Sequence, residues 1–65
     1  MKNLYELRKF LLKFGTIIYI GDPLADLELM EEEMNELYQV NLITQDQFIQ
    51  AKLIITREKE KLVKG

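Results

Sequence analysis

The chain has 65 residues, a formal net charge of −2, and neither cysteine nor histidine. A chain of this length forms one domain that buries only about 60% of the surface its unfolded state exposes, so we expect a single domain over residues 1–65. Without cysteine there is no disulfide or thiolate site, and without histidine the commonest acid–base and metal-binding side chain is missing.

The charges are segregated along the chain. Residues 14–51 carry no lysine or arginine but hold eight of the eleven acidic residues. The nine basic residues lie in the two terminal segments: Lys2, Arg8, Lys9, Lys13, Lys52, Arg57, Lys59, Lys61 and Lys64. A basic surface can recruit an anionic partner, whereas an acidic segment of the same chain can neutralise it. The sequence leaves both interpretations open.

The first predicted helix spans residues 3–14. Asn3 followed by Glu6 has the spacing of a capping box, and Gly15 is a typical stop. The apolar residues follow at spacings of three and four, which places them on one face of a helix: Leu4, Leu7, Leu11 and Phe14.

Residues 16–20 are β-branched and aromatic and lie between two glycines, a local pattern typical of a strand. No other segment offers such a strand a pairing partner. We therefore expect an extended or single-turn apolar linker over residues 15–21 that packs under the helices as part of the core.

The second predicted helix spans residues 23–40. Asp22 is a favourable N-cap, and Pro23 suits the first helical position because its missing N–H needs no partner there. Asn41 tolerates the left-handed conformation that ends many helices. The apolar stripe of this helix is Leu27, Met30, Met34 and Leu37.

The third predicted helix spans residues 45–62 and begins with a second capping box, Thr44 and Gln47. Its expected inner face is Phe48, Ala51, Ile55 and Leu62, and the charged tail after residue 56 is expected to fray. The short connection from the second helix is typical of an αα-hairpin. The fold class is therefore all-α: a small three-helix bundle with a short apolar linker between the first and second helices.

Paired carboxylates are the remaining route to catalysis. Glu28, Glu32 and Glu36 are neighbours at i, i+4 on one helical face and could bind a hard cation through oxygen. There is no EF-hand loop and no second carboxylate helix, so we expect a solvated acidic face. The expectation is a protein that is not an enzyme and needs neither a metal nor a cofactor.

The lysines of the first helix, Lys2, Lys9 and Lys13, fall opposite its apolar stripe. Clustered lysines beside an aromatic ring can hold phosphates and stack an unpaired base. The alternative is an ordinary solvated face, or pairing with the acids of the second helix. The candidate residues for binding single-stranded nucleic acid are Lys2, Tyr5, Arg8, Lys9, Lys13 and Arg57.

A second apolar side of the third helix carries Ile49 and Leu53. Either these residues contact the isoleucines of the linker inside the bundle, or they bury this side against a second copy of the chain or another protein. A homodimer or protein adaptor is thus the alternative function. No apolar run approaches the ~20 residues needed to cross a membrane, and we expect a cytoplasmic protein.

Residues 14–38 resemble the YqgQ-like family of small bacterial proteins. The similarity lies in the pattern GTIIY-x-GD over residues 15–22, in DLE-x-ME over residues 26–31, and in ELY followed by LI-x-x-x-x-F from residue 36. The resemblance implies a compact three-helix fold in a cytosolic protein and an assignment to single-stranded nucleic-acid binding. It carries no catalytic motif, and it transfers no binding residue to this chain.

Overall fold

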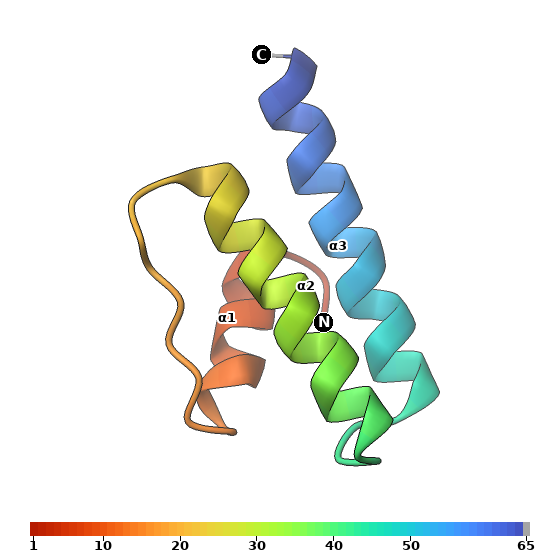
Figure 1. Cartoon of the computed structure of the whole chain (residues 1–65). Coiled ribbons are helices and arrows are strands. Elements are labelled where there is room, and N and C mark those ends of the chain that lie inside the picture. The colour runs from red at the N-terminus through yellow and green to blue at the C-terminus, as the bar shows by residue number, and fades with distance from the viewer. Residues whose placement is uncertain (65) are drawn as a thin grey trace.

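The computed structural model describes residues 1–64, and these residues form three α-helices and no β-strand (Figure 1). Helix α1 spans Leu4–Leu12, α2 spans Pro23–Gln39 and α3 spans Gln45–Lys64. The predicted all-α three-helix fold is confirmed. That residues 1–65 form one domain stays a prediction, and Gly65 lies outside the described residues.

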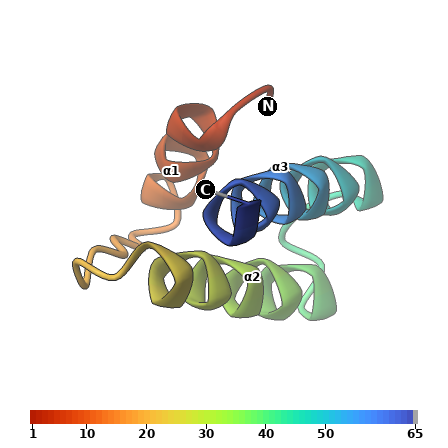
Figure 2. The same ribbon diagram turned by 90° about the horizontal axis from the view of Figure 1, so that it is seen from above.

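Helices α2 and α3 form an antiparallel hairpin, and α1 packs behind it (Figure 1). The linker between α1 and α2 runs along the side of these two helices that faces away from α3, as both ribbon views show (Figure 2). The last turns of α3 project beyond the start of α2. The linker and the projecting end of α3 are thus at the margins of the bundle.

The ends of α1 are set by local hydrogen bonds. The Glu6 N–H donates to Asn3 Oδ1 over 2.9 Å, while the Glu6 carboxylate accepts from the Lys2 N–H over 2.7 Å. At the other end Gly15 has φ +77°, and the N–H groups of Gly15 and Thr16 donate to carbonyls of the last turn. This pair of bonds is a Schellman motif, which needs the left-handed conformation that glycine adopts without strain.

The α2–α3 hairpin also follows its predicted signals. Asp22 accepts hydrogen bonds from the N–H groups of the first turn of α2, the shorter from Leu24 at 3.1 Å. Asn41 has φ +62° and ends α2 in a second Schellman motif. Thr44 and Gln47 exchange hydrogen bonds of 2.9 and 3.1 Å, which completes the predicted capping box.

The core lies where the three apolar stripes meet. The four predicted stripe residues of α2 are all buried, as are Leu7 and Leu11 of α1. The buried apolar residues are Leu7, Leu11, Leu27, Met30, Met34, Leu37, Ile43, Ala51, Ile54 and Ile55. Ile54 was not on the predicted face of α3; it is buried because α3 packs against two helices and therefore needs a wider apolar face.

Three details of the prediction were wrong. Phe14 is 37% exposed because it follows the end of α1, where its ring packs edge-on against Phe10. Leu62 is 44% exposed because it lies near the projecting end of α3. That end does not fray: the helix continues to Lys64, with a 3.0 Å ion pair from Lys61 to Glu58 one turn earlier.

The linker was expected to pack under the helices, and this expectation is also wrong. Ile17 and Tyr19 are each 79% exposed and Ile20 is 62% exposed, while Ile18 packs against the core. A stretched segment turns alternate side chains to opposite sides, so the linker lies on the surface with Ile18 inward and its neighbours in solvent.

Candidate nucleic-acid interface

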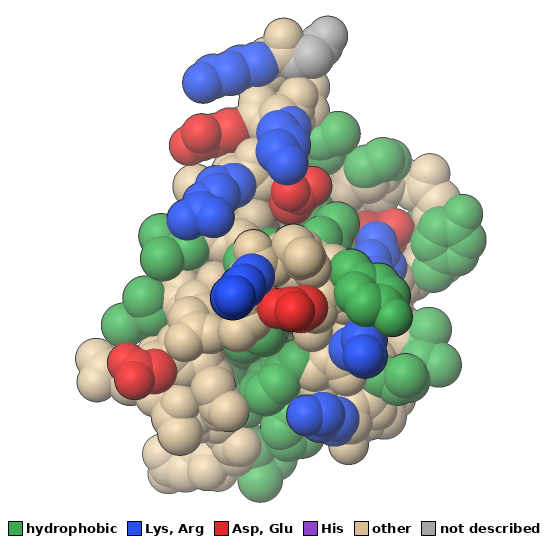
Figure 3. Space-filling model, turned by 180° about the vertical axis from the view of Figure 1, so that it is seen from behind, with side chains coloured by type: hydrophobic (Ala, Val, Ile, Leu, Met, Phe, Trp, Pro, Cys, Tyr) green, Lys and Arg blue, Asp and Glu red, His purple; other side chains and the backbone are tan. Residues whose placement is uncertain are grey.

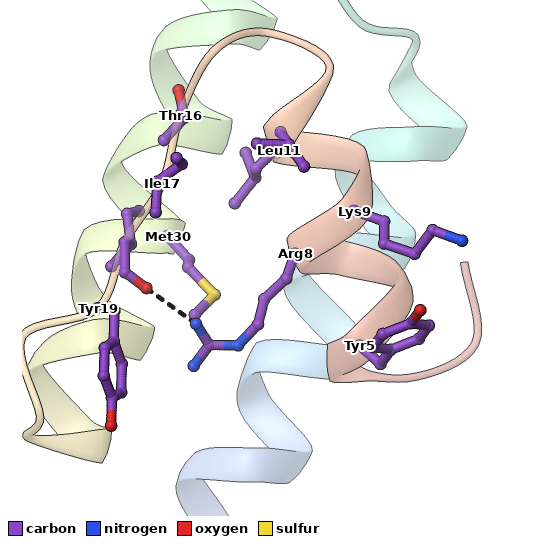
Figure 4. Close-up of a pocket in the computed structure, with 10 residues that line it drawn as sticks. Tyr5, Arg8, Lys9, Leu11, Thr16, Ile17, Tyr19 and Met30 are labelled. Carbon is purple, nitrogen blue, oxygen red and sulfur yellow. Dashed lines mark hydrogen bonds between the residues drawn. The ribbon is translucent and has the colours of Figure 1, made fainter.

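An arginine and an aspartate fasten the linker to the helices. Arg8 of α1 donates from Nη1 to the Ile18 carbonyl oxygen over 2.8 Å (Figure 4), and Asp26 of α2 accepts from the Ile20 N–H over 2.8 Å. Arg8 Nη2 and Asp26 Oδ2 are 4.0 Å apart, and the Asp26 side chain is 4% exposed. Arg8 is therefore a structural residue in the folded chain, with its guanidinium partly committed to the linker.

A groove of about 320 Å³ lies between α1 and the linker. Leu11 and Met30 contribute to its wall, and Tyr5 of α1 and Tyr19 of the linker lie on opposite sides of Arg8 (Figure 4). Both tyrosine rings are largely exposed. The groove thus offers two aromatic rings and a guanidinium along an otherwise apolar surface.

The lysines at α1 do not pair with the acids of α2. Of the three that were expected on one helical face, only Lys9 lies within α1, since Lys2 precedes the N-cap Asn3 and Lys13 is the C-cap. Lys2, Lys9 and Lys13 are exposed, and within residues 1–64 none of them forms an ion pair. The Lys9 Nζ lies 5.3 Å from the centroid of the Tyr5 ring, within cation–π range. The face on which α1 lies carries scattered lysine and arginine side chains, with acidic and hydrophobic side chains among them (Figure 3).

The ion pairs between α2 and α3 centre on Glu31. Its carboxylate accepts from Lys52 Nζ over 2.9 Å and from Lys59 Nζ over 3.0 Å. These two hydrogen bonds, that from Lys52 foremost, lower the pKa of Glu31 despite its partial burial. The charge segregation of the sequence is therefore used in part inside the hairpin. Two lysines of α3 pair with Glu31 of the acidic helix, and α1 contributes the longer pair from Arg8 to Asp26.

Three further acids of α2 stay in solvent. Glu28, Glu32 and Glu36 are exposed and form no ion pair within the described chain. In that same part of the chain, no three acidic side chains gather closely enough to hold a metal ion. Arg57 is exposed on α3, apart from the groove residues of α1 and the linker.

Ile49 and Leu53 are 47% and 52% exposed. The interpretation that they contact the linker is wrong, because the linker lies beside α1 and α2 on the side away from α3 (Figures 1 and 2). They form an uncovered apolar patch on the hairpin. Separately, none of the helices described in residues 1–64 combines the length and apolar character needed to cross a membrane.

Two residues of the site escaped the sequence analysis. Asp26 was treated as one more acid of α2, although it is 3% exposed; its place beside the apolar stripe of that helix was the available signal. Tyr19 was assigned to the core. Its alternation with Ile18 in an extended segment was the signal that the two side chains point to opposite sides.

The fold and the site define a small all-α protein whose extended linker is tied to α1 and α2 by an arginine and an aspartate. The model of the YqgQ-like family matches residues 1–61. The chain is also 32% identical over 65 residues to "Uncharacterized protein YqgQ" of Bacillus subtilis (strain 168), with 100% of this chain and 92% of that protein covered. The chain therefore belongs to the YqgQ-like family, as the motifs in residues 14–38 indicated.

Proposed function

We propose that this chain is a non-enzymatic, cytoplasmic module that binds single-stranded nucleic acid through α1 and the linker. The observation that carries the proposal is the juxtaposition of three exposed lysines, unpaired within residues 1–64, with a groove flanked by Tyr5 and Tyr19.

The lysines supply the electrostatic attraction to the phosphates of the nucleic acid. Lys9 lies on α1, Lys2 just before it and Lys13 just after it, and all three are exposed. Within residues 1–64 they form no ion pair that would have to be broken before they meet phosphates. Each neutralised phosphate of a single strand releases counterions, which gives a slope of about −0.7 in log affinity against log salt. Three lysine contacts predict a slope of about −2.

The aromatic rings supply the stacking interaction that favours a single strand over a duplex. Unpaired bases stack on exposed rings whatever their sequence, and Tyr5 and Tyr19 are 68% and 79% exposed. Lys9 lies over the Tyr5 ring, where it can contact the phosphate next to a stacked base. The net charge of −2 disfavours duplex binding that depends on positive potential alone.

The test is fluorescence anisotropy of a labelled oligothymidine of roughly 15 nucleotides, the upper range of one small domain's site size, titrated at several salt concentrations. Lys9→Gln and Lys13→Gln should each weaken binding and lower the salt slope by about 0.7, and Tyr5→Ala should weaken it about tenfold through lost stacking. No binding at low salt would refute the proposal.

The matched control is Lys61→Gln, which removes an exposed lysine already paired with Glu58 at the far end of α3. An equal loss for Lys61→Gln and Lys9→Gln would mean that only overall charge matters, against a site on α1. Arg57→Gln tests separately whether α3 contributes, as the sequence analysis proposed.

The second candidate function is a protein adaptor or homo-oligomer that uses the apolar patch of Ile49 and Leu53. The observation that favours it is that both side chains are about half exposed on an otherwise well-packed hairpin. Light scattering combined with Ile49→Asp and Leu53→Asp tests it. Variants that fold normally and keep the same oligomeric state and partners as the native chain would contradict this function.

A further inference from the structure

The linker has one edge that the helices bond in part, at the Ile18 C=O and the Ile20 N–H, and one edge without such bonds. Residues 16–20 are neither helical nor turned, and they run as a stretched segment beside α1 and α2 (Figure 1). In such a segment the N–H and C=O of one residue point to the same edge, and those of the next residue to the opposite edge. The residues therefore divide into two sets, with Ile18 and Ile20 on one edge and Ile17 and Tyr19 on the other.

The inner edge forms hydrogen bonds with two side chains, where a β-sheet would have a neighbouring strand. Arg8 donates to the Ile18 carbonyl oxygen, and Asp26 accepts from the Ile20 N–H, each over 2.8 Å. On the outer edge, the N–H and C=O groups of Ile17 and Tyr19 have no hydrogen-bond partner within residues 1–64. The chain thus presents four unpaired backbone groups in the spacing of a β-strand edge.

This edge lacks the usual protection against pairing. Proteins shield exposed strand edges with charged side chains, proline or a covering element. Residues 14–21 contain no charge and no proline, and Ile17 and Tyr19 are each 79% exposed. The composition also favours strand pairing, since β-branched and aromatic residues fit a pleated surface.

We propose that residues 16–20 pair with the same segment of a second copy of this chain in an intermolecular antiparallel β-ribbon. With Ile18 of each copy on the two-fold axis, Ile17 lies opposite Tyr19 of the second copy. The two residues exchange both N–H···O=C bonds, so symmetry gives four bonds in total. Each Ile17 side chain then packs against a tyrosine ring, a favourable cross-strand pair.

The charges at the two ends of the segment favour antiparallel pairing with a second copy of the chain. Lys13 precedes the uncharged stretch and Asp22 follows it. Antiparallel pairing centred on Ile18 brings Lys13 of one copy to the end that carries Asp22 of the other, twice by symmetry. A parallel pairing would place Lys13 against Lys13, which like-charge repulsion disfavours. The inference does not depend on nucleic-acid binding.

The test is sedimentation equilibrium of the full chain over a concentration series, combined with amide hydrogen exchange followed by NMR. A dimer is expected, and its formation should slow exchange at the N–H groups of Ile17 and Tyr19, while the N–H of Ile18 keeps its rate. A chain that stays monomeric into the millimolar range overturns the proposal. A dimer whose formation leaves amide exchange at Ile17 and Tyr19 unchanged also overturns it. A dimer that dissociates when Ile49 is replaced by aspartate overturns it as well, because the contact would then lie on α3.

A pair of variants isolates the backbone contribution. Tyr19→Pro and Tyr19→Thr both remove the ring, but only proline removes the outward N–H. Proline at this position also suits an extended preceding residue. The dimer dissociation constant should rise at least about tenfold more for Tyr19→Pro than for Tyr19→Thr, because two hydrogen bonds are lost per dimer. If both variants keep the helical circular dichroism of the native chain and raise the dissociation constant equally, the proposal is overturned.

Discussion

Replacing Asp26 by alanine tests how the linker is held. The Asp26 carboxylate is almost completely buried, accepts from the Ile20 N–H over 2.8 Å and lies 4.0 Å from the Arg8 guanidinium. Alanine removes the acceptor and leaves Arg8 with only the Ile18 carbonyl. The linker then loses one of its two fastenings, and the end next to α2 is the one released.

The size of the effect follows from these contacts. A hydrogen bond to a charged group contributes about 1.5–3 kcal/mol, and a pair at 4.0 Å with a 40% exposed arginine adds at most about 1 kcal/mol. Two effects reduce the loss in the free energy of unfolding. The mutant no longer buries a carboxylate, and the Ile20 N–H can bond to water because Ile20 is 62% exposed. We expect a loss of about 2 kcal/mol in the free energy of unfolding.

A loss of this size is large for a domain whose core supplies roughly 3–5 kcal/mol in all. Thermal unfolding by circular dichroism should show Tm lowered by about 10 °C, and the Ile20 amide should exchange faster. Asp26→Asn, which keeps an acceptor oxygen, should lose less. Glu28→Ala on the same helix, an exposed acid with no partner, should change stability by less than about 0.5 kcal/mol. An equally small change for Asp26→Ala would refute the reasoning.

Three further predictions concern the rest of the fold. Lys52 and Lys59 lower the pKa of Glu31 from 4.5, so the stability they confer is present above that pKa and lost as the pH falls through the lowered value; acid titration of Glu31→Gln should lack this loss, which is about 1 kcal/mol. Gly15→Ala should cost about 1 kcal/mol in urea unfolding, because φ is +77° although an added Cβ meets nothing within 4 Å; a stabilised variant would contradict this. Ile55→Ala should remove about 2–5 kcal/mol and leave the chain largely unfolded by circular dichroism; a native-like melting curve would argue against the assigned core.

The helix boundaries were readable from the sequence because they depend on neighbouring residues. Asn3, Asp22 and Thr44 cap through atoms two or three residues away, and Gly15 and Asn41 end helices through their own backbone conformation. The α2 stripe was equally readable, since one face of a helix is a local property. The exposure of Leu62 was not, because it depends on how far α3 projects beyond the start of α2. Phe14 is exposed because α1 ends before it, at Leu12.

The candidate site was only partly predictable. Lys9 and Tyr5 are one helical turn apart, so their proximity follows from α1 alone. Arg8 was assigned with them as a phosphate-binding candidate, but its guanidinium reaches a carbonyl ten residues further on. That contact exists only when the linker folds back along α1, and no local pattern encodes the path of a linker.

The sequence by itself determined three capped helices, the inner face of α2, and the separation of basic ends from an acidic middle, because each is a matter of composition or short-range spacing. The tertiary structure alone decided which charges meet. Glu31 lies against Lys52 and Lys59, while Lys9 of α1 and the flanking Lys2 and Lys13 are exposed to solvent. It also placed the apolar linker on the surface with an open edge, because Arg8 of α1 and Asp26 of α2 hold the linker backbone beside these helices and leave Ile17 and Tyr19 exposed.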